Sequence, residues 1–198
     1  LVLISFVAVP LAWVANYRRQ SLREERIAEA LQESGFDVEL CGPYDSVDQD
    51  PFAESQDWRD FARDVLGQRI FWIAGAKSDI KEFALLAPLT SLKSLNIYNA
   101  NVSDLSPLAR LSGLQSLRLQ ESPISDLRPL AGLKNLQEIN LDNTRVNDLS
   151  PLAQLTNLQI LNVNGTKVSD LTPLAGLKNL QALGVQNTSV INLKPLAG

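Results

Sequence analysis

The side chains that usually carry out catalysis are scarce in this chain. Its 198 residues include no histidine and a single cysteine, Cys41. Nucleophilic chemistry of the Ser–His or Cys–His type is therefore excluded, and so is a zinc site with the usual cysteine and histidine ligands. Acidic residues are present, but no Asp/Glu pair stands out from an ordinary surface background. We therefore predict a non-enzymatic protein that binds no cofactor.

A calcium site is the next possibility, because Asp45, Asp48 and Asp50 lie close together in the sequence. Their spacing lacks the D-x-D-x-D-G order of a calcium-binding loop. The surrounding residues 41–56 are rich in turn formers and include two prolines. We expect a solvated acidic loop rather than a metal site.

Polar side chains at a fixed spacing are better candidates for function. The rows that begin at Leu92, Leu114, Leu136, Leu158 and Leu180 repeat every 22 residues, with apolar residues at repeat positions 1, 4, 6, 11, 14, 17 and 20. Side chains alternate between the two faces of a strand, so positions 4 and 6 point inward while positions 3, 5 and 7 point outward. The candidate binding residues on the outward face are Asn96, Tyr98, Arg118, Gln120, Glu138, Asn140, Asp142, Asn162 and Asn164.

Tyr98 and Arg118 are the expected centre of this face, because they fall on adjacent strands and both residue types are frequent in binding hot spots. Six short strands present on the order of 400 Å², about half of one side of a standard interface. The face is thus either merely solvated or a surface that binds a protein, a short peptide or a glycan with modest affinity. The net charge of −4, with no basic stripe, argues against nucleic acid.

The elements that must position these side chains follow from the period. A repeat of this length predicts an α/β solenoid, with a parallel sheet on the concave face and short helical turns on the convex face. Residues 70–91 keep the same spacing in degenerate form, so we predict six repeats over 70–198, the last one incomplete. Asp at position 13 is expected to accept backbone N–H bonds. Ser106, Ser150 and Thr172 precede phased prolines and are expected to be N-caps.

The repeats also share a motif, D-L-x-P-L-A, in the stretches Asp104–Ala109, Asp126–Ala131, Asp148–Ala153 and Asp170–Ala175. This motif resembles the short, 22-residue type of bacterial leucine-rich repeat found in internalin-like proteins. The asparagine usual at position 9 is replaced by Ala100, Ser122, Thr144, Thr166 and Thr188. A hydroxyl at this position can still bond the backbone, but the replacement argues against an unbroken asparagine ladder there. The resemblance implies a non-enzymatic scaffold that presents a recognition surface.

The N-terminal segment carries no charge over residues 1–15, and Trp13, Tyr17, Arg18 and Arg19 lie at its end. These residues favour a membrane–water boundary, so we predict that 1–16 is a single-pass membrane anchor. As a helix, 1–15 reaches about 22 Å, short of the ~30 Å hydrocarbon core, so we expect further apolar residues upstream. A cleaved signal peptide and a buried helix remain as alternatives. The side of the membrane on which the repeats lie stays open.

Between the anchor and the repeats we expect three elements. Residues 17–35 are predicted to form a solvated juxtamembrane helix, with a coiled-coil dimer as the alternative. Residues 36–56 are predicted to form a short strand and the acidic loop, and 57–69 to form a helix that caps the first repeat. No polar cap is encoded after the last repeat, which predicts either further sequence or an end-to-end dimer.

Three functions fit this organisation. The first is a membrane-tethered module for protein–protein interaction, with its partner unidentified. The second is a secreted, adhesin-like or glycan-binding module. The third is a regulatory repeat domain of a larger enzyme or receptor.

Overall fold

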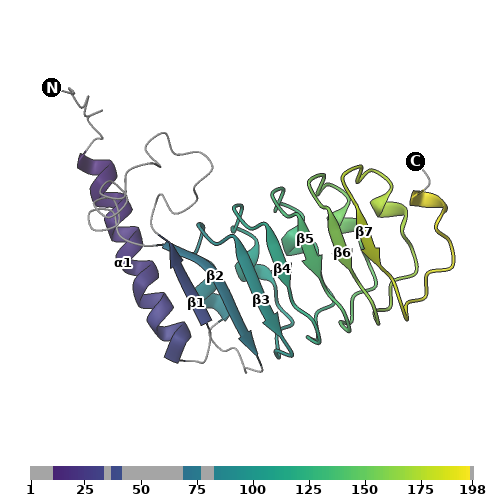
Figure 1. Ribbon diagram of the computed structural model, residues 1–198, viewed down its shortest axis with the longest axis horizontal. Coiled ribbons are helices and arrows are strands. Elements are labelled where there is room, and N and C mark those ends of the chain that lie inside the picture. The colour runs from purple at the N-terminus through teal and green to yellow at the C-terminus, as the bar shows by residue number, and fades with distance from the viewer. Residues whose placement is uncertain (1–10, 34–36, 42–68, 77–82, 197–198) are drawn as a thin grey trace.

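The computed structural model describes residues 11–33, 37–41, 69–76 and 83–196 (Figure 1). Helix α1 (Leu11–Glu33) comes first. The strands that follow are β1 (Asp37–Cys41), β2 (Arg69–Ala76), β3 (Ser94–Tyr98), β4 (Ser116–Arg118), β5 (Glu138–Asn140), β6 (Ile160–Asn162) and β7 (Ala182–Gly184). They form one sheet in the order of the sequence.

The strands from β2 onward pair in parallel, and the register advances by one repeat at each step. Leu95 lies opposite Leu117, Leu117 opposite Ile139, and Ile139 opposite Leu161. Parallel strands need a crossover, and here short 3₁₀ turns complete it behind the sheet: η2 (Phe83–Leu86), η3 (Ser106–Leu108), η4 (Arg128–Leu130), η5 (Ser150–Leu152), η6 (Thr172–Leu174) and η7 (Lys194–Leu196). The predicted solenoid is confirmed.

Strand β2 lies in the segment that was predicted to be a degenerate first repeat. Strand β2 pairs in parallel with β3, and Trp72 lies opposite Ser94, which is 22 residues later in the sequence. The short strand predicted near residue 36 is also present as β1, which pairs antiparallel with β2.

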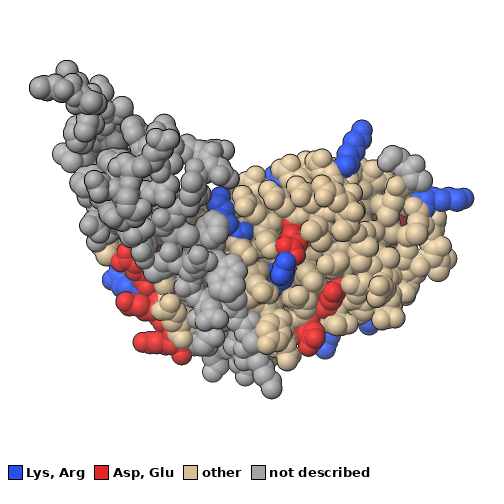
Figure 2. All heavy atoms as spheres, in the orientation of Figure 1, with Lys and Arg blue, Asp and Glu red and all other residues tan. Residues whose placement is uncertain are grey.

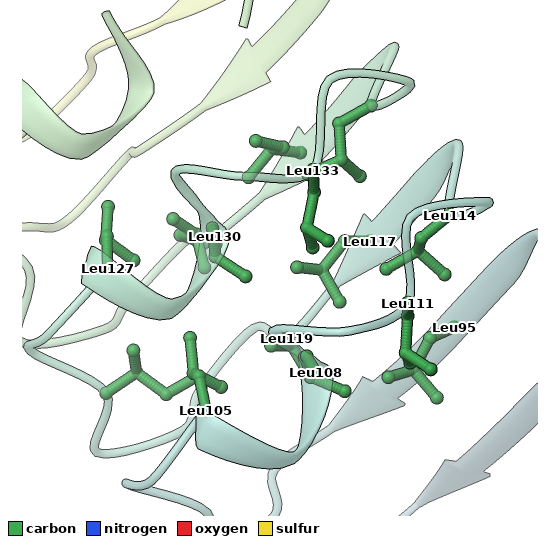
Figure 3. Packing of buried hydrophobic residues seen from close by; sticks show 14 of the residues in the cluster. Leu95, Leu105, Leu108, Leu111, Leu114, Leu117, Leu119, Leu127, Leu130 and Leu133 are labelled. Atoms are coloured by element: carbon green, nitrogen blue, oxygen red, sulfur yellow. The ribbon is translucent and has the colours of Figure 1, made fainter. Parts of the chain in front are cut away.

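The core lies between the sheet and the turns. The inward strand residues Leu95, Ile97, Leu117 and Leu119 are fully buried, and so is Leu108 from a turn. Figure 3 shows strand and turn leucines of neighbouring repeats pointing into one interior. Full burial of each such side chain contributes about 1.5–3 kcal/mol, so the stacked leucines are the main source of stability.

The aspartates at position 13 shape each turn, as predicted. The Oδ1 atoms of Asp104, Asp148 and Asp170 each accept the backbone N–H two residues later at 2.8 Å. The predicted N-caps are wrong: Ser106 is the first residue of η3, and the capping position belongs to Leu105, whose side chain makes no capping bond. The aspartate, through an Asx turn, supplies the acceptor that a cap would have supplied.

The prediction that residues 17–35 form a solvated helix is wrong over the second half of α1. The helix runs unbroken from Leu11 and contacts both β1 and β2. Glu24, Ile27, Ala28 and Leu31 are buried there, and the Ser91 hydroxyl donates to Glu24 Oε2 at 2.8 Å. Helix α1 therefore covers the N-terminal end of the core, the role that we expected of residues 57–69.

Other N-terminal predictions fall largely outside the described residues. These include most of the anchor at 1–16, the acidic loop after Cys41, and the helix at 57–69 up to residue 68. Among the described helices, none has the length and apolar character needed to cross a bilayer.

The C-terminal end of the core is less well covered than the rest. Leu180, Leu183 and Val190 are only partly buried, and Leu193 is 60% exposed. A groove of about 570 Å³ opens here between the last strand and the last turns, and Leu177 and Leu196 contribute to its walls.

Candidate interaction surface

The nine candidate side chains lie together on the solvent face of the sheet, in three rows that run across the strands. Glu138 belongs to the row at position 3. The middle row at position 5 holds Asn96, Arg118, Asn140 and Asn162, which lie opposite one another in register. The third row is named row 7 after its repeat position. It holds Tyr98, Gln120, Asp142 and Asn164, at the carboxyl ends of the strands.

The middle of the face carries an ion pair within the protein itself. Arg118 Nε donates to Glu138 Oε1 at 2.8 Å, and its Nη2 lies 2.7 Å from the same oxygen. The Ser116 hydroxyl donates to Glu138 Oε2 at 3.2 Å. The side chains of Arg118 and Glu138 are 45% and 23% exposed, so a pair of this kind contributes only about 0–1 kcal/mol. Its main effect is that the Glu138 carboxylate neutralises the positive charge of Arg118 within the protein.

Tyr98 and Arg118 were expected to be neighbours across adjacent strands. The register places Arg118 opposite Asn96, so Tyr98 lies diagonally from it, at the end of β3. Tyr98 is 50% exposed, and Ile160 on the same face is 37% exposed. The face therefore combines one half-exposed aromatic ring with amide groups and few charges, and most of the described surface in Figure 2 is uncharged.

Position 7 forms a ladder between side chains and backbone that the sequence analysis missed. Asp142 Oδ1 accepts the Asn164 backbone N–H at 2.7 Å, and Asn164 Oδ1 accepts the Gln186 backbone N–H at 2.7 Å. Each acceptor thus ties its repeat to the next one. The 22-residue spacing of two short acceptor side chains was the available signal. Asp142 and Asn164 consequently have a structural role beside any binding role.

Gln120 interrupts this ladder. The Asp142 backbone N–H, which a shorter side chain at residue 120 would bind, donates instead to Asn140 Oδ1 at 3.0 Å. Gln120 Oε1 is buried and has no hydrogen-bond partner, the one such side-chain atom in the described part of the chain. A buried acceptor without a donor costs about 1–3 kcal/mol.

Gly184 keeps room for two of the candidate amides. A Cβ at this residue would lie 2.6 Å from Asn162 Oδ1 and 2.7 Å from Asn164 Nδ2. Glycine at the centre of β7 therefore lets the side chains of the preceding strand lean across the sheet.

Two further sets of bonds hold the repeats without belonging to the sheet face. At position 9, Thr144 Oγ1 donates to the Leu141 carbonyl at 2.7 Å, which confirms that a hydroxyl can replace the usual asparagine. An asparagine ladder is present instead at position 22, at the start of the turn into the next strand. There Asn135, Asn157 and Asn179 each donate to a carbonyl of the preceding repeat, at 2.7, 2.9 and 2.7 Å.

The position-13 aspartates lie on the turn side, away from the candidate surface. Hydrogen bonds from the Arg128 side chain and backbone lower the pKa of Asp126 to about 2. Bonds from Ser106 lower the pKa of Asp104 in the same way, and bonds from Ser150 that of Asp148. These carboxylates hold the turn, and the described residues contain no cluster of three or more metal-binding side chains.

Residues 112–154 match the sequence profile of the family described as "Leucine Rich repeats (2 copies)". The protein has a leucine-rich repeat fold. The chain is 30% identical in sequence to internalin C2 from Listeria monocytogenes. Its structure matches the crystal structure of that protein with a TM-score of 0.53, over 65% of this chain and 66% of that one. A leucine-rich repeat protein from Leptospira interrogans is 28% identical, with a TM-score of 0.54 over 58% of this chain and 32% of that one.

The chain spans slightly less than two thirds of internalin C2 and about one third of the Leptospira protein. No curated protein matches it. The family profile and these two structures support a bacterial, internalin-like leucine-rich repeat module, a type of module that typically serves protein–protein interaction.

Proposed function

We propose that the protein is a membrane-tethered interaction module that binds a protein partner with the sheet face centred on Tyr98 and Arg118. The observation that supports this most directly is the exposure of Tyr98. Strand residues on the core side are fully buried, whereas this aromatic ring is 50% exposed at the end of β3. Tyrosine contributes a large contact area at low conformational cost, which is why it is frequent at interfaces.

The surroundings of Tyr98 favour a partner with a definite shape. The Arg118–Glu138 pair is held within hydrogen-bonding distance, and the row-7 side chains of Asp142 and Asn164 are fixed by backbone bonds. A surface with restrained side chains loses less conformational entropy on binding. The small area of the face, on the order of 400 Å², predicts modest affinity unless the flanks also contribute.

The binding proposal is tested by affinity capture with the full chain, followed by the double variant Tyr98→Ala/Arg118→Ala. The captured partner is expected to fall about tenfold or more, because truncation of central aromatic and arginine side chains accounts for most interface energy. The matched control is Arg110→Ala/Lys178→Ala, which removes surface charge outside the sheet face, where both residues are exposed. Undiminished capture by the first variant, with an unchanged melting temperature, would refute the assignment.

The membrane tether rests on the uncharged residues 1–15 and on the aromatic and arginine residues that follow them. Helix α1 begins at Leu11 and continues into the part that covers the repeats, so a tether here would hold the sheet close to the bilayer. Fractionation of cells that express the full chain should recover it in carbonate-washed membranes. A variant without residues 1–10 should be released. Recovery of the full chain in the soluble fraction would eliminate the tether and leave the binding face untouched.

A further inference from the structure

We infer that the row-7 site formed by Tyr98, Gln120 and Asp142 binds an arginine side chain of the partner. The inference rests on the proposed function and names the chemistry that this part of the face recognises. The three side chains follow one another on adjacent strands: the Gln120 carbonyl accepts the Asn99 N–H, and the Asp142 carbonyl accepts the Glu121 N–H, both at 2.9 Å. Strands at ~4.8 Å spacing place Tyr98 and Asp142 roughly 10 Å apart, with Gln120 between them.

Gln120 supplies the first reason to expect a donor. Its Oε1 is buried without a partner, although the same row uses shorter side chains to complete bonds in the next two repeats. An amide left in this state gains a hydrogen bond when it turns outward to a donor from a partner. An unsatisfied buried group in an otherwise well-bonded sheet points to such a functional constraint.

Asp142 supplies the charge. Its Oδ1 is engaged by the Asn164 N–H. Across the described residues, no lysine or arginine forms an ion pair with it, whereas Glu138 is paired with Arg118. Glu121 adds a second carboxylate next to Gln120, also without an ion pair among those residues. The basic residue nearest to Asp142 in the sequence is Arg145, three residues later. Figure 2 shows acidic side chains at the lower edge of the sheet face, with basic atoms beside them, and further acidic atoms in the middle of the face.

Tyr98 supplies a flat apolar surface, and its half-exposed ring is available for stacking. A guanidinium group is planar and always charged, and it carries five donors in a fixed geometry. It can therefore stack on the ring and donate at the same time to Gln120 and to the second oxygen of Asp142. An ammonium group has the charge but not the plane, so the site fits arginine better than lysine.

The probe for this site is N-acetyl-arginine amide, and the matched control is N-acetyl-citrulline amide, which has the same shape without the charge. Both are titrated into the isotopically labelled full chain and followed by NMR. Arginine is expected to shift the Tyr98 ring and Gln120 amide signals saturably, with a Kd on the order of a millimolar, and citrulline to bind about tenfold more weakly.

The variant that isolates the charge is Asp142→Asn. Asparagine retains an Oδ1 acceptor, as Asn164 shows in the next repeat, so the ladder bond to the Asn164 N–H is kept. We expect this variant to lose most of the arginine binding while its melting temperature stays the same. Glu29→Gln, at an exposed position of α1, is the control that removes one carboxylate elsewhere.

Equal binding of citrulline, shifts that map away from row 7, or unchanged binding by Asp142→Asn would each overturn the inference. These outcomes differ from a failure of the proposed function. If the arginine probe does not bind but Tyr98→Ala/Arg118→Ala still loses its partner, the face is an interface without an arginine site. If the probe binds and that double variant keeps its partner, the site binds a guanidinium group that does not belong to this partner, and both the proposed interface and the partner's arginine are refuted.

Discussion

Replacement of Gln120 by asparagine should stabilise the protein. Gln120 is one methylene too long to continue the row-7 ladder, and its Oε1 is left buried without a donor. In the same row, Asp142 and Asn164 each accept a backbone N–H of the next repeat at 2.7 Å. The variant Gln120→Asn should therefore accept the Asp142 N–H and extend the ladder by one repeat.

The size of the effect follows from what is gained and lost. The Asp142 N–H already donates to Asn140 Oδ1 at 3.0 Å, so its new bond replaces an existing one and contributes little. Removal of the unpaired buried oxygen contributes about 1–3 kcal/mol. Loss of one partly buried methylene costs up to about 0.8 kcal/mol. The net stabilisation is thus about 1 kcal/mol, which corresponds to a melting temperature about 2–4 °C higher for a domain of this size.

Thermal unfolding monitored by circular dichroism, together with urea denaturation, measures this change. The control is Gln186→Asn, a glutamine of the same row whose side chain is exposed, and its melting temperature should stay within about 1 °C. A second check uses Asn140→Ala, which removes the present acceptor of the Asp142 N–H. It should cost less in the Gln120→Asn background than in the natural sequence, because the N–H then has another acceptor.

A melting temperature that is unchanged or lower in Gln120→Asn would refute the reasoning, since it would show that the Gln120 amide is already satisfied. The same variant is expected to weaken binding of the arginine probe, because it commits the amide oxygen to the backbone. If Gln120→Asn is more stable and binds the arginine probe more weakly, the natural glutamine favours binding at the cost of stability.

Three further predictions concern the repeats themselves. Leu149→Asp should unfold the repeats, because it buries an unpaired carboxylate at a site that is 1% exposed. The control Asn147→Asp, at an exposed neighbouring residue, should leave them folded. Circular dichroism and proteolysis measure both outcomes. Asn164→Ala should lower the free energy of unfolding in urea by about 0.5–1.5 kcal/mol, whereas Asn164→Asp, which keeps an acceptor oxygen, should cost less. The pKa of Asp126 is about 2 in the folded state, below its unfolded value near 4, so its contribution to stability is present above about pH 4 and is lost as the pH falls towards 2. The urea midpoint should therefore decline over that range less steeply in Asp126→Asn than in the natural protein, and equal slopes would count against the Arg128 bonds as the cause.

The sequence was sufficient to predict the repeats, because the interactions that form them are local and recur at a fixed spacing. Leucines at a strict 22-residue spacing can be buried only if each repeat stacks on the next, so the apolar pattern determined both the solenoid and the outward face. The turn aspartates were also predictable, since an Asx turn needs only a carboxylate two residues before the bonded N–H. The 22-residue spacing also holds in the backbone pairing of β2 with β3, where Trp72 lies opposite Ser94.

The N-terminal cap was not predictable in the same way. The apolar stripe of α1 is thin, and a helix with many charged residues is typical of a solvated element. Only contacts between α1, β1 and β2 showed that this helix buries Glu24, Ile27 and Leu31, and that the Ser91 hydroxyl supports the buried carboxylate. Burial of a charged residue depends on a partner that is distant in the sequence, which no local pattern reveals.

The candidate surface shows the same division between sequence and structure. Alternation along each strand was enough to list the side chains of the sheet face, because the two-residue period decides which side they occupy. Which of these side chains are engaged within the protein depended on the register and spacing of neighbouring strands. That tertiary arrangement pairs Arg118 with Glu138, commits Asp142 and Asn164 to the backbone, and leaves the Gln120 oxygen without a donor. Hydrogen bonds between strands require angstrom-scale proximity of residues about 20 positions apart in the sequence, and only the folded chain provides it.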